Sequence, residues 1–214
     1  MIDPTKITNY NLTIPELEEH LLFWVFAAGH NAKSTARGVE KFLNKVYEES
    51  DYPYNPFCAI LDTMTERGWD KIVEALSTSG LGCWKIKSNT IHQLIFSNLN
   101  LRTCSIEDLE EISGIGPKTA RCFVMHSRPN IRAAGLDTHI LNCLNDLGLT
   151  VKKVPGKKYK KIENKFLEFA DASKKSIAEL DLMIWNAYSS GKNKNETLSF
   201  LRSIKMPDSW YDAP

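Results

Sequence analysis

The stretch Leu109–Ala120, which reads LEEISGIGPKTA, decides the fold because it contains a helix end, a turn and a helix start. Two glycines, Gly114 and Gly116, flank an apolar residue, and a proline opens the next helix. Glycine permits a tight turn and keeps side chains away from the backbone amides. The N-terminus of the following helix adds partial positive charge at the same point. The stretch therefore predicts a rigid hairpin between two helices that can hold a phosphate through its backbone.

Helical periodicity dominates on both sides of this stretch, and strand patterns are scarce. No internal repeat or low-complexity segment interrupts it. We expect an all-α fold with short connections, arranged as two helical lobes with a cleft between them. The predicted helices lie at about 14–28, 33–49, 57–64, 69–76, 85–97, 105–112, 118–126, 138–147, 157–170, 176–189 and 197–204.

The charge of the chain is unevenly distributed, although its net value is only +1. Residues 151–194 contain eleven lysines against five acids, a local charge of +6, whereas the predicted first helix begins with acidic residues. One face could therefore be basic enough to meet a nucleic acid. The alternative is that these lysines only form a solvated helix surface.

Composition excludes several other classes of protein. The five cysteines include no CxxC pair, so no zinc or iron–sulfur ligand set is expected, and the thiols are expected to be reduced. No apolar run approaches the roughly 20 residues that span a bilayer. The N-terminus lacks the basic region followed by an apolar region that is typical of a secretory signal. We therefore expect a cytoplasmic protein that is not secreted and that is nucleoid-associated if it is prokaryotic. We expect a monomer that does not bind membranes.

The string GIGPKTA, followed nineteen residues after its lysine by Asp137 in LDTHI, carries a family resemblance. It resembles the helix-hairpin-helix and aspartate loop of the endonuclease III-like DNA glycosylase superfamily. The resemblance implies one glycosylase unit over 1–214, with the hairpin at about 105–126, the catalytic aspartate loop at 133–139 and a tail at 195–214.

In that superfamily, a lysine at the position of Lys118 marks the bifunctional members. The resemblance implies that Lys118 attacks C1′ of the damaged nucleotide, forms a Schiff base and then cleaves the strand by β-elimination. Partial burial and a helix N-terminus both disfavour the protonated amine, which suits a nucleophile. Asp137 would stabilise positive charge on the sugar and help to take the lysine proton. Asp137 could also simply cap the next helix, and the two roles are compatible.

The resemblance also implies contacts to double-stranded DNA with a damaged base. We expect Gly114, Gly116, Thr119 and His139 to contact the DNA backbone; alternatively, His139 only packs against its neighbours. His30 or Asn31, after the first helix, would fill the gap left by an extruded base, or else Gly29–Asn31 only breaks the helix.

Two tryptophans of the first half receive no such role. Trp24 lies in an apolar run and is expected in the core. Trp84 is expected in a loop.

Near the other end, Leu180–Trp185 places Asp181 and Trp185 on one helix face. This region resembles the archaeal-type 8-oxoguanine DNA glycosylases, in whose relatives such an Asp and Trp pair lines the lesion pocket. Alternatively, Trp185 is core and Asp181 a solvated acid. In one family of these enzymes the chain ends at a lysine whose terminal carboxylate helps to recognise the oxidised base. Here Lys194 stands at that position and twenty more residues follow it, so the chain lacks that carboxylate.

The sequence thus predicts a DNA glycosylase with AP lyase activity that removes 8-oxoguanine. The resemblance implies no metal or organic cofactor; an alkali ion at the hairpin carbonyls would be structural. The first alternative is a glycosylase for oxidised pyrimidines. The missing iron–sulfur cluster and the Leu180–Trp185 string argue against it. The second alternative is a non-catalytic hairpin module that binds DNA. The presence of both Lys118 and Asp137 argues against it.

Overall fold

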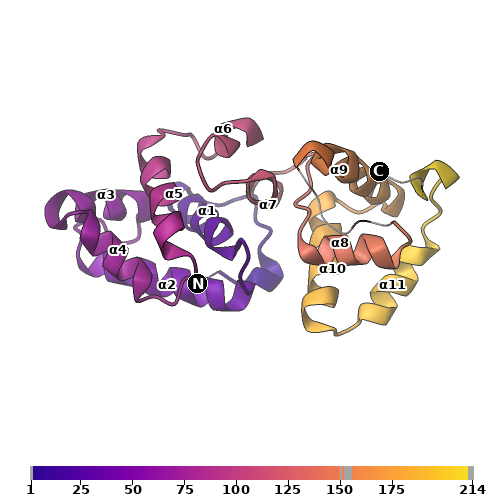
Figure 1. Ribbon diagram of the computed structural model, residues 1–214, viewed down its shortest axis with the longest axis horizontal. Helices are drawn as coiled ribbons and strands as arrows, with labels where there is room; N and C mark the ends of the chain where they lie inside the picture. The colour runs from indigo at the N-terminus through magenta and orange to yellow at the C-terminus, as the bar shows by residue number, and fades with distance from the viewer. Residues whose placement is uncertain (1, 150, 152–155, 212–214) are drawn as a thin grey trace. The chain divides into compact units, whose positions relative to one another are not determined.

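The structure, a computed structural model, describes residues 2–149, 151 and 156–211. Every regular element in these residues is helical, which confirms the all-α prediction (Figure 1). Lys152 and Lys153 of the lysine-rich segment, and residues 212–214 of the predicted tail, lie outside the described residues. The helices are η1 (Pro4–Lys6), α1 (Ile14–Ala27), α2 (Ala32–Glu48), α3 (Pro56–Arg67), α4 (Trp69–Ser77), α5 (Trp84–Phe96), α6 (Ile106–Glu110), α7 (Pro117–Ser127), α8 (Thr138–Asp146), α9 (Gly156–Ser173), α10 (Ile177–Ser190), α11 (Lys194–Ser203) and η2 (Asp208–Tyr211).

The chain divides into two compact units, and the boundary falls inside α7, between Phe123 and Val124. The first unit therefore contains the predicted hairpin and Lys118, whereas the second contains Asp137 and the lysine-rich segment. Two compact helical units agree with the expected lobes, while the cleft between lobes stays a prediction. None of the helices in the described residues is long and apolar enough to cross a membrane.

The first unit is built on the helices α1 to α5, each of which contacts at least two of the others. Each helix contributes apolar side chains at helical spacing to one core, as the periodicity predicted. The central members are fully buried: Leu22 and Phe26 of α1, Phe42 of α2, Ile60 of α3, Ile72 of α4 and Ile91 of α5.

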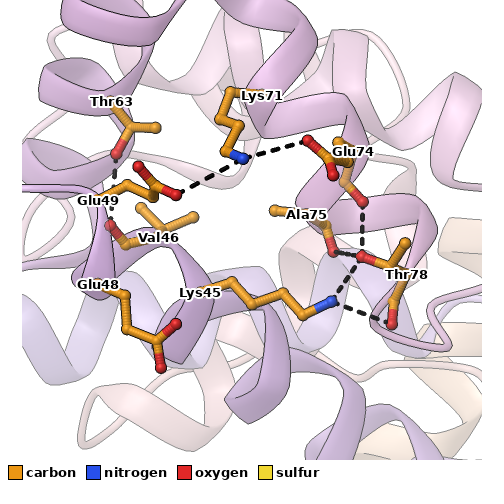
Figure 2. Close-up of a pocket in the computed structure, with 9 residues that line it drawn as sticks. All are labelled: Lys45, Val46, Glu48, Glu49, Thr63, Lys71, Glu74, Ala75 and Thr78. Carbon is orange, nitrogen blue, oxygen red and sulfur yellow. Dashed lines mark hydrogen bonds and ion pairs between the residues drawn. The ribbon is translucent and has the colours of Figure 1, made fainter.

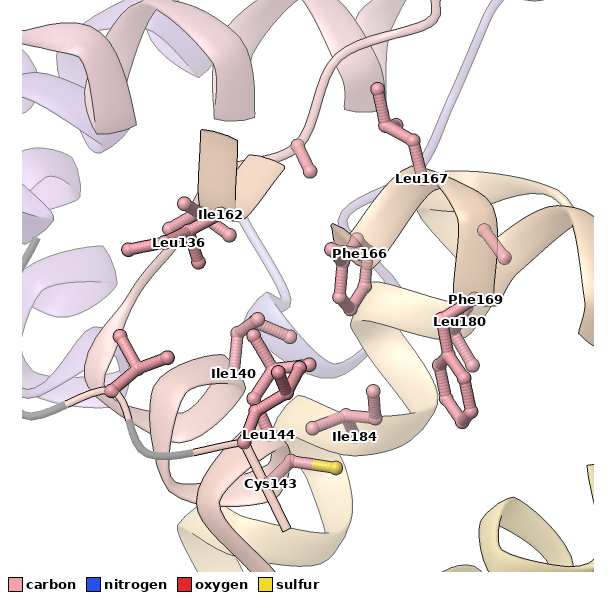
Figure 3. Close-up of a cluster of buried hydrophobic side chains, with 14 of the residues drawn as sticks. Leu136, Ile140, Cys143, Leu144, Ile162, Phe166, Leu167, Phe169, Leu180 and Ile184 are labelled. Atoms are coloured by element: carbon pink, nitrogen blue, oxygen red, sulfur yellow. The ribbon is translucent and has the colours of Figure 1, made fainter. Parts of the chain in front are cut away.

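The second unit is built around α10, which contacts α8, α9 and α11. Its core joins side chains of α8, α9 and α10, which Figure 3 shows converging. Labelled there are Ile140, Cys143 and Leu144 of α8, Phe166 and Phe169 of α9, and Leu180 and Ile184 of α10.

Described residues beyond Lys194 contribute to this second core, among them Leu201 and Trp210. The Trp210 side chain is 1% exposed, its ring packs 5.5 Å from that of Phe169, and its Nε1 donates to the Lys165 carbonyl over 2.9 Å. The tail residues that the structure describes therefore complete the fold of the second unit.

Side-chain caps fix where several helices begin. Thr13 with Glu16 forms a capping box at α1, and Ser105 with Asp108 forms one at α6, both at predicted helix starts. Hydrogen bonds from Thr13 hold the pKa of Glu16 below its usual range, and those from Ser105 do the same for Asp108. A capping box depends only on residue types at a fixed local spacing, so both boxes fall where the sequence predicted a helix to begin.

Three local expectations were wrong. Trp84 does not lie in a loop but begins α5, because Cys83 adopts a left-handed conformation and starts the helix directly after the glycines. Helix α6 ends at Glu110, short of the predicted Ile112, because the chain already turns into the hairpin. Helix α11 begins at Lys194, earlier than predicted, because its first turn contains no apolar residue that reveals the period.

Candidate functional site

The hairpin before α7 is held in place by α5. The Thr90 hydroxyl donates to the Ser113 carbonyl over 2.7 Å, and the Gln93 side-chain oxygen accepts from the Ser113 amide over 2.9 Å. Ile115 is buried, as expected for a residue that packs back between two helices. Gly114 has a φ of +94°, and a Cβ there would lie 2.1 Å from the Thr90 hydroxyl oxygen. Only glycine fits this position.

Gly116 serves a different purpose from Gly114. Its backbone is not in the left-handed region, and a Cβ added to it would meet nothing within 4 Å. The residue is exposed, and it immediately precedes the N-terminus of α7, where backbone amides lack helical partners. The hairpin thus presents bare backbone to solvent beside the positive end of a helix, an arrangement that suits a phosphate.

Lys118 lies in the first turn of α7 and is partly buried. Its Nζ is 5.0 Å from the centroid of the Trp24 ring, within the range of a cation–π contact. Trp24 is only partly buried, so the expectation that it belongs to the core was wrong. The next residue, Thr119, is 3% exposed, so its side chain is not presented to solvent for the expected DNA contact.

Asp137 is the N-cap of α8. Its Oδ1 accepts from the amides of His139 and Ile140 over 2.8 and 2.9 Å. The capping geometry considered from the sequence is therefore present, and it leaves the catalytic role open because the two are compatible. Lys118 and Asp137 belong to different units, and their joint action stays a prediction.

The aspartate loop before Asp137 is fixed by two buried side chains of α9. The Tyr159 hydroxyl accepts from the Leu136 amide over 2.9 Å and donates to the Ala134 carbonyl over 2.8 Å. The Glu163 carboxylate, with no exposed surface, accepts from the Ala134 amide over 2.9 Å. Buried backbone groups need such partners, and these partners hold the loop in one conformation.

Asp181 and Trp185 share a face of α10, as predicted. Asp181 is not a solvated acid: it is buried, and its Oδ2 lies 3.1 Å from Nε2 of His126, whose side chain is also buried. Trp185 is partly exposed, and the His139 ring meets it edge-on with centroids 6.1 Å apart. The structure therefore brings together Trp185 and His139, two residues for which different roles were expected.

His30 and Asn31 are both exposed at the turn between α1 and α2. Asn31 caps α2, its side-chain oxygen accepting from the Ser34 amide over 3.1 Å. The His30 ring lies against Gly82, where a Cβ would come within 2.0 Å of it. Burial, with a contribution from the charge of Lys87, lowers the pKa of His30.

The Lys87 side chain stabilises the turn between α1 and α2. It is buried, and its ammonium donates to the carbonyls of Phe26 and Ala28 at the end of α1 over 2.9 and 3.3 Å. Burial lowers the pKa of Lys87. Sequence reasoning missed Lys87 because a single lysine in a helix carries no signal of burial.

The Lys194 side chain makes its contacts within the second unit. Its Nζ lies 3.0 Å from the Asp146 carboxylate and 4.3 Å from the Tyr188 ring centroid. Hydrogen bonds from Lys194 and Tyr188 hold the pKa of Asp146 below its usual range.

A pocket of about 190 Å³ lies elsewhere in the first unit, among α2, α3 and α4 (Figure 2). None of the predicted site residues lines it. Lys71 bridges Glu49 and Glu74 over 3.5 and 3.3 Å, and Lys45 donates to the Thr78 hydroxyl over 2.6 Å. Lys71 thus pairs with two carboxylates across the pocket, whereas Lys45 is bound by neutral oxygens of Thr78. The described residues also contain no cluster of His, Cys, Asp and Glu that could hold a metal ion.

Comparison with known proteins gives one match. A family model described as Helix-hairpin-helix motif matches residues 99–124, which span α6, the hairpin and most of α7. No curated protein and no solved structure matches the chain significantly. The chain thus carries a helix-hairpin-helix motif at the predicted place, and the motif indicates DNA binding.

Proposed function

We propose that this protein is a base-excision DNA glycosylase with AP lyase activity, which removes 8-oxoguanine through a Schiff base on Lys118. The observation that carries the proposal is the position of Lys118, in the first helical turn after a hairpin that matches the helix-hairpin-helix motif. A hairpin that only binds DNA needs no half-buried lysine there.

The hairpin supplies the DNA contact. A phosphate next to the damaged nucleotide would approach the exposed backbone at Gly116 and the amides at the start of α7. Such contacts position the duplex without reading its sequence, and affinity that depends on them falls as salt concentration rises.

Lys118 supplies the nucleophile. Its neutral amine attacks C1′ of the damaged nucleotide, the bond from C1′ to the base breaks, and the base leaves with the bonding electrons. Loss of the amine proton and opening of the sugar ring then give the Schiff base. Removal of a proton from C2′ expels the 3′ phosphate by β-elimination, which is the lyase step.

Asp137 supplies charge stabilisation. Its carboxylate would face the positive charge that develops on the sugar and receive the proton released by the amine. The fixed loop favours this role, because a preorganised charge does not have to reorganise as the reaction proceeds.

The lesion would be read by the second unit. Trp185 offers a partly exposed aromatic face on which a flipped base can stack. The Asp181 carboxylate, whose Oδ2 is engaged by His126, is the proposed hydrogen-bond partner of the base. The Lys194 side chain contacts Asp146. Recognition of the lesion is therefore assigned to Asp181 and Trp185 and not to Lys194.

Borohydride trapping tests this proposal. Duplexes with one 8-oxoguanine, one thymine glycol or no lesion are incubated with the wild type, Lys118→Gln and Lys41→Gln, in which an exposed lysine of α2 is changed as a control. We expect a covalent adduct on the 8-oxoguanine duplex with the wild type and Lys41→Gln, and none with Lys118→Gln.

Each other result contradicts part of the proposal. An adduct only with thymine glycol would move the substrate to oxidised pyrimidines. Binding of every duplex without base release would indicate a non-catalytic DNA-binding module. An adduct that survives Lys118→Gln would remove Lys118 from the chemistry.

A further inference from the structure

Trp24 differs from its neighbours in the apolar run of α1. Phe23 and Val25, on either side of it, are each 1% exposed, whereas Trp24 keeps part of its surface accessible. Burial in the core therefore does not account for this tryptophan. Its ring lies instead beneath the amine of Lys118, 5.0 Å from Nζ to the ring centroid.

The Trp24 ring is held in a fixed orientation. Its Nε1 donates to Nε2 of His20, one turn earlier in α1, over 3.3 Å. The Phe23 ring meets it edge-on, with centroids 5.2 Å apart at 69°. The His20 ring in turn lies 5.8 Å from the ring of Phe123, which belongs to α7, the helix of Lys118. The Trp24 ring is thus held rigidly, and through His20 it packs with α7, the helix that carries Lys118.

We propose that Trp24 is a positioning residue for Lys118, keeping the amine at the start of α7 ready for attack. This inference rests on the glycosylase function proposed above. A lysine side chain has four rotatable bonds, and an unrestrained amine would spend most of its time away from the hairpin. A cation–π contact favours the held conformation of the charged amine by about 2-fold to 30-fold, and it acts again on the positive charge that the nitrogen acquires as the neutral amine attacks C1′.

The same contact has a second consequence of opposite sign. The face of an indole attracts the ammonium form and does not attract the neutral amine. Trp24 therefore makes Lys118 less reactive towards small reagents in solution while it keeps the amine close to bound DNA. The two effects can be separated, because only the second depends on a bound substrate.

The first experiment measures single-turnover adduct formation on the 8-oxoguanine duplex for the wild type, Trp24→Phe and Trp24→Leu. We expect Trp24→Leu to slow adduct formation about 2-fold to 30-fold without changing DNA affinity, as positioning predicts. Trp24→Phe, which keeps an aromatic face, is expected to recover most of the rate. An unchanged rate in Trp24→Leu overturns the proposal. A Phe variant as slow as the Leu variant indicates packing alone and also overturns it.

The second experiment needs no DNA and no enzymatic activity. The same three proteins are methylated with formaldehyde and cyanoborohydride, and the extent of reaction at Lys118 is read by mass spectrometry against exposed Lys41 in the same sample. We expect Lys118 to react faster in Trp24→Leu than in the wild type, with Trp24→Phe in between. Equal reactivity in all three proteins overturns the contact itself.

Together the experiments separate the two proposals. If no duplex gives an adduct with the wild type but the methylation order holds, the glycosylase function fails and the contact of Trp24 with Lys118 stands. If adducts form and neither readout responds to Trp24, the glycosylase stands and this inference fails.

Discussion

Lys118 in the first unit and Asp137 in the second are held by different kinds of contact. Lys118 has a long side chain, partly exposed, that rests on an aromatic face. Asp137 has a short side chain whose Oδ1 binds two backbone amides, on a loop fixed by buried Tyr159 and Glu163. The difference matches the two proposed roles. A nucleophile, even one positioned by Trp24, must still move to C1′, whereas a stabilising charge works best when it is fixed beforehand.

The largest expected effect comes from separating the charge of Asp137 from its capping role. Asparagine caps a helix about as well as aspartate does but carries no charge. We expect Asp137→Asn to keep the stability of the wild type while its single-turnover rate falls about 100-fold to 10,000-fold. Asp137→Ala is expected to lose the rate and also about 1 kcal/mol of stability. Adduct formation and urea unfolding measure the two quantities.

The contrary outcome is equally informative. If Asp137→Asn retains the wild-type rate, Asp137 is only a helix cap, and the contrast between a fixed charge and a movable nucleophile disappears. If both variants are equally unstable, the carboxylate holds more of the second unit together than its two amide bonds indicate.

The next largest effect concerns what keeps the aspartate loop fixed. Tyr159 and Glu163 lie on α9, and the buried Trp210 side chain packs on Phe169 and binds the Lys165 carbonyl of the same helix. We expect Trp210→Ala to lower the free energy of unfolding by about 3–5 kcal/mol, the usual range for removing a buried aromatic ring. Urea unfolding followed by circular dichroism measures it.

A tail residue of similar type provides the control. Phe200 of α11 is 39% exposed, so we expect Phe200→Ala to cost less than about 1 kcal/mol. Equal losses in the two variants would contradict the assignment of Trp210 to the core of the second unit.

The sequence predicted most of the fold because its signals are local. Hydrophobic period, proline and glycine positions, and the box formed by Ser105 and Asp108 depend on residues that are near one another in the chain. The hairpin was predictable for the same reason: Gly114, Gly116 and Pro117 act on their own backbone.

Contacts between distant segments could not be predicted. The pairing of His126 with Asp181 joins residues fifty-five apart, and the bond from the Ala134 amide to Glu163 joins residues twenty-nine apart. Nothing in the local pattern distinguishes a buried Glu163 from an exposed glutamate of the same helix. Trp24 was wrongly assigned to the core because an apolar run predicts a buried helix face but does not show which of its residues stays partly exposed.

The smallest expected effects come from the two glycines of the hairpin, which separate folding from binding within the first unit. Gly114→Ala would place a methyl group 2.1 Å from the Thr90 hydroxyl oxygen at a positive φ, and we expect it to cost about 1–3 kcal/mol of stability. Gly116→Ala has open space around its methyl group and is expected to leave stability unchanged. Thermal unfolding measures both.

The Gly116 methyl group would instead stand where a phosphate has to approach the backbone. Losing one backbone hydrogen bond to that phosphate corresponds to a decrease in DNA affinity of about 2-fold to 10-fold, which a titration of labelled duplex at fixed salt can resolve. Wild-type affinity in Gly116→Ala would mean that the phosphate is not bound through bare backbone at this position. Side chains would then have to supply the DNA contact. If Lys118 supplied it, the contrast between a fixed charge on Asp137 and a nucleophile on Lys118 would disappear.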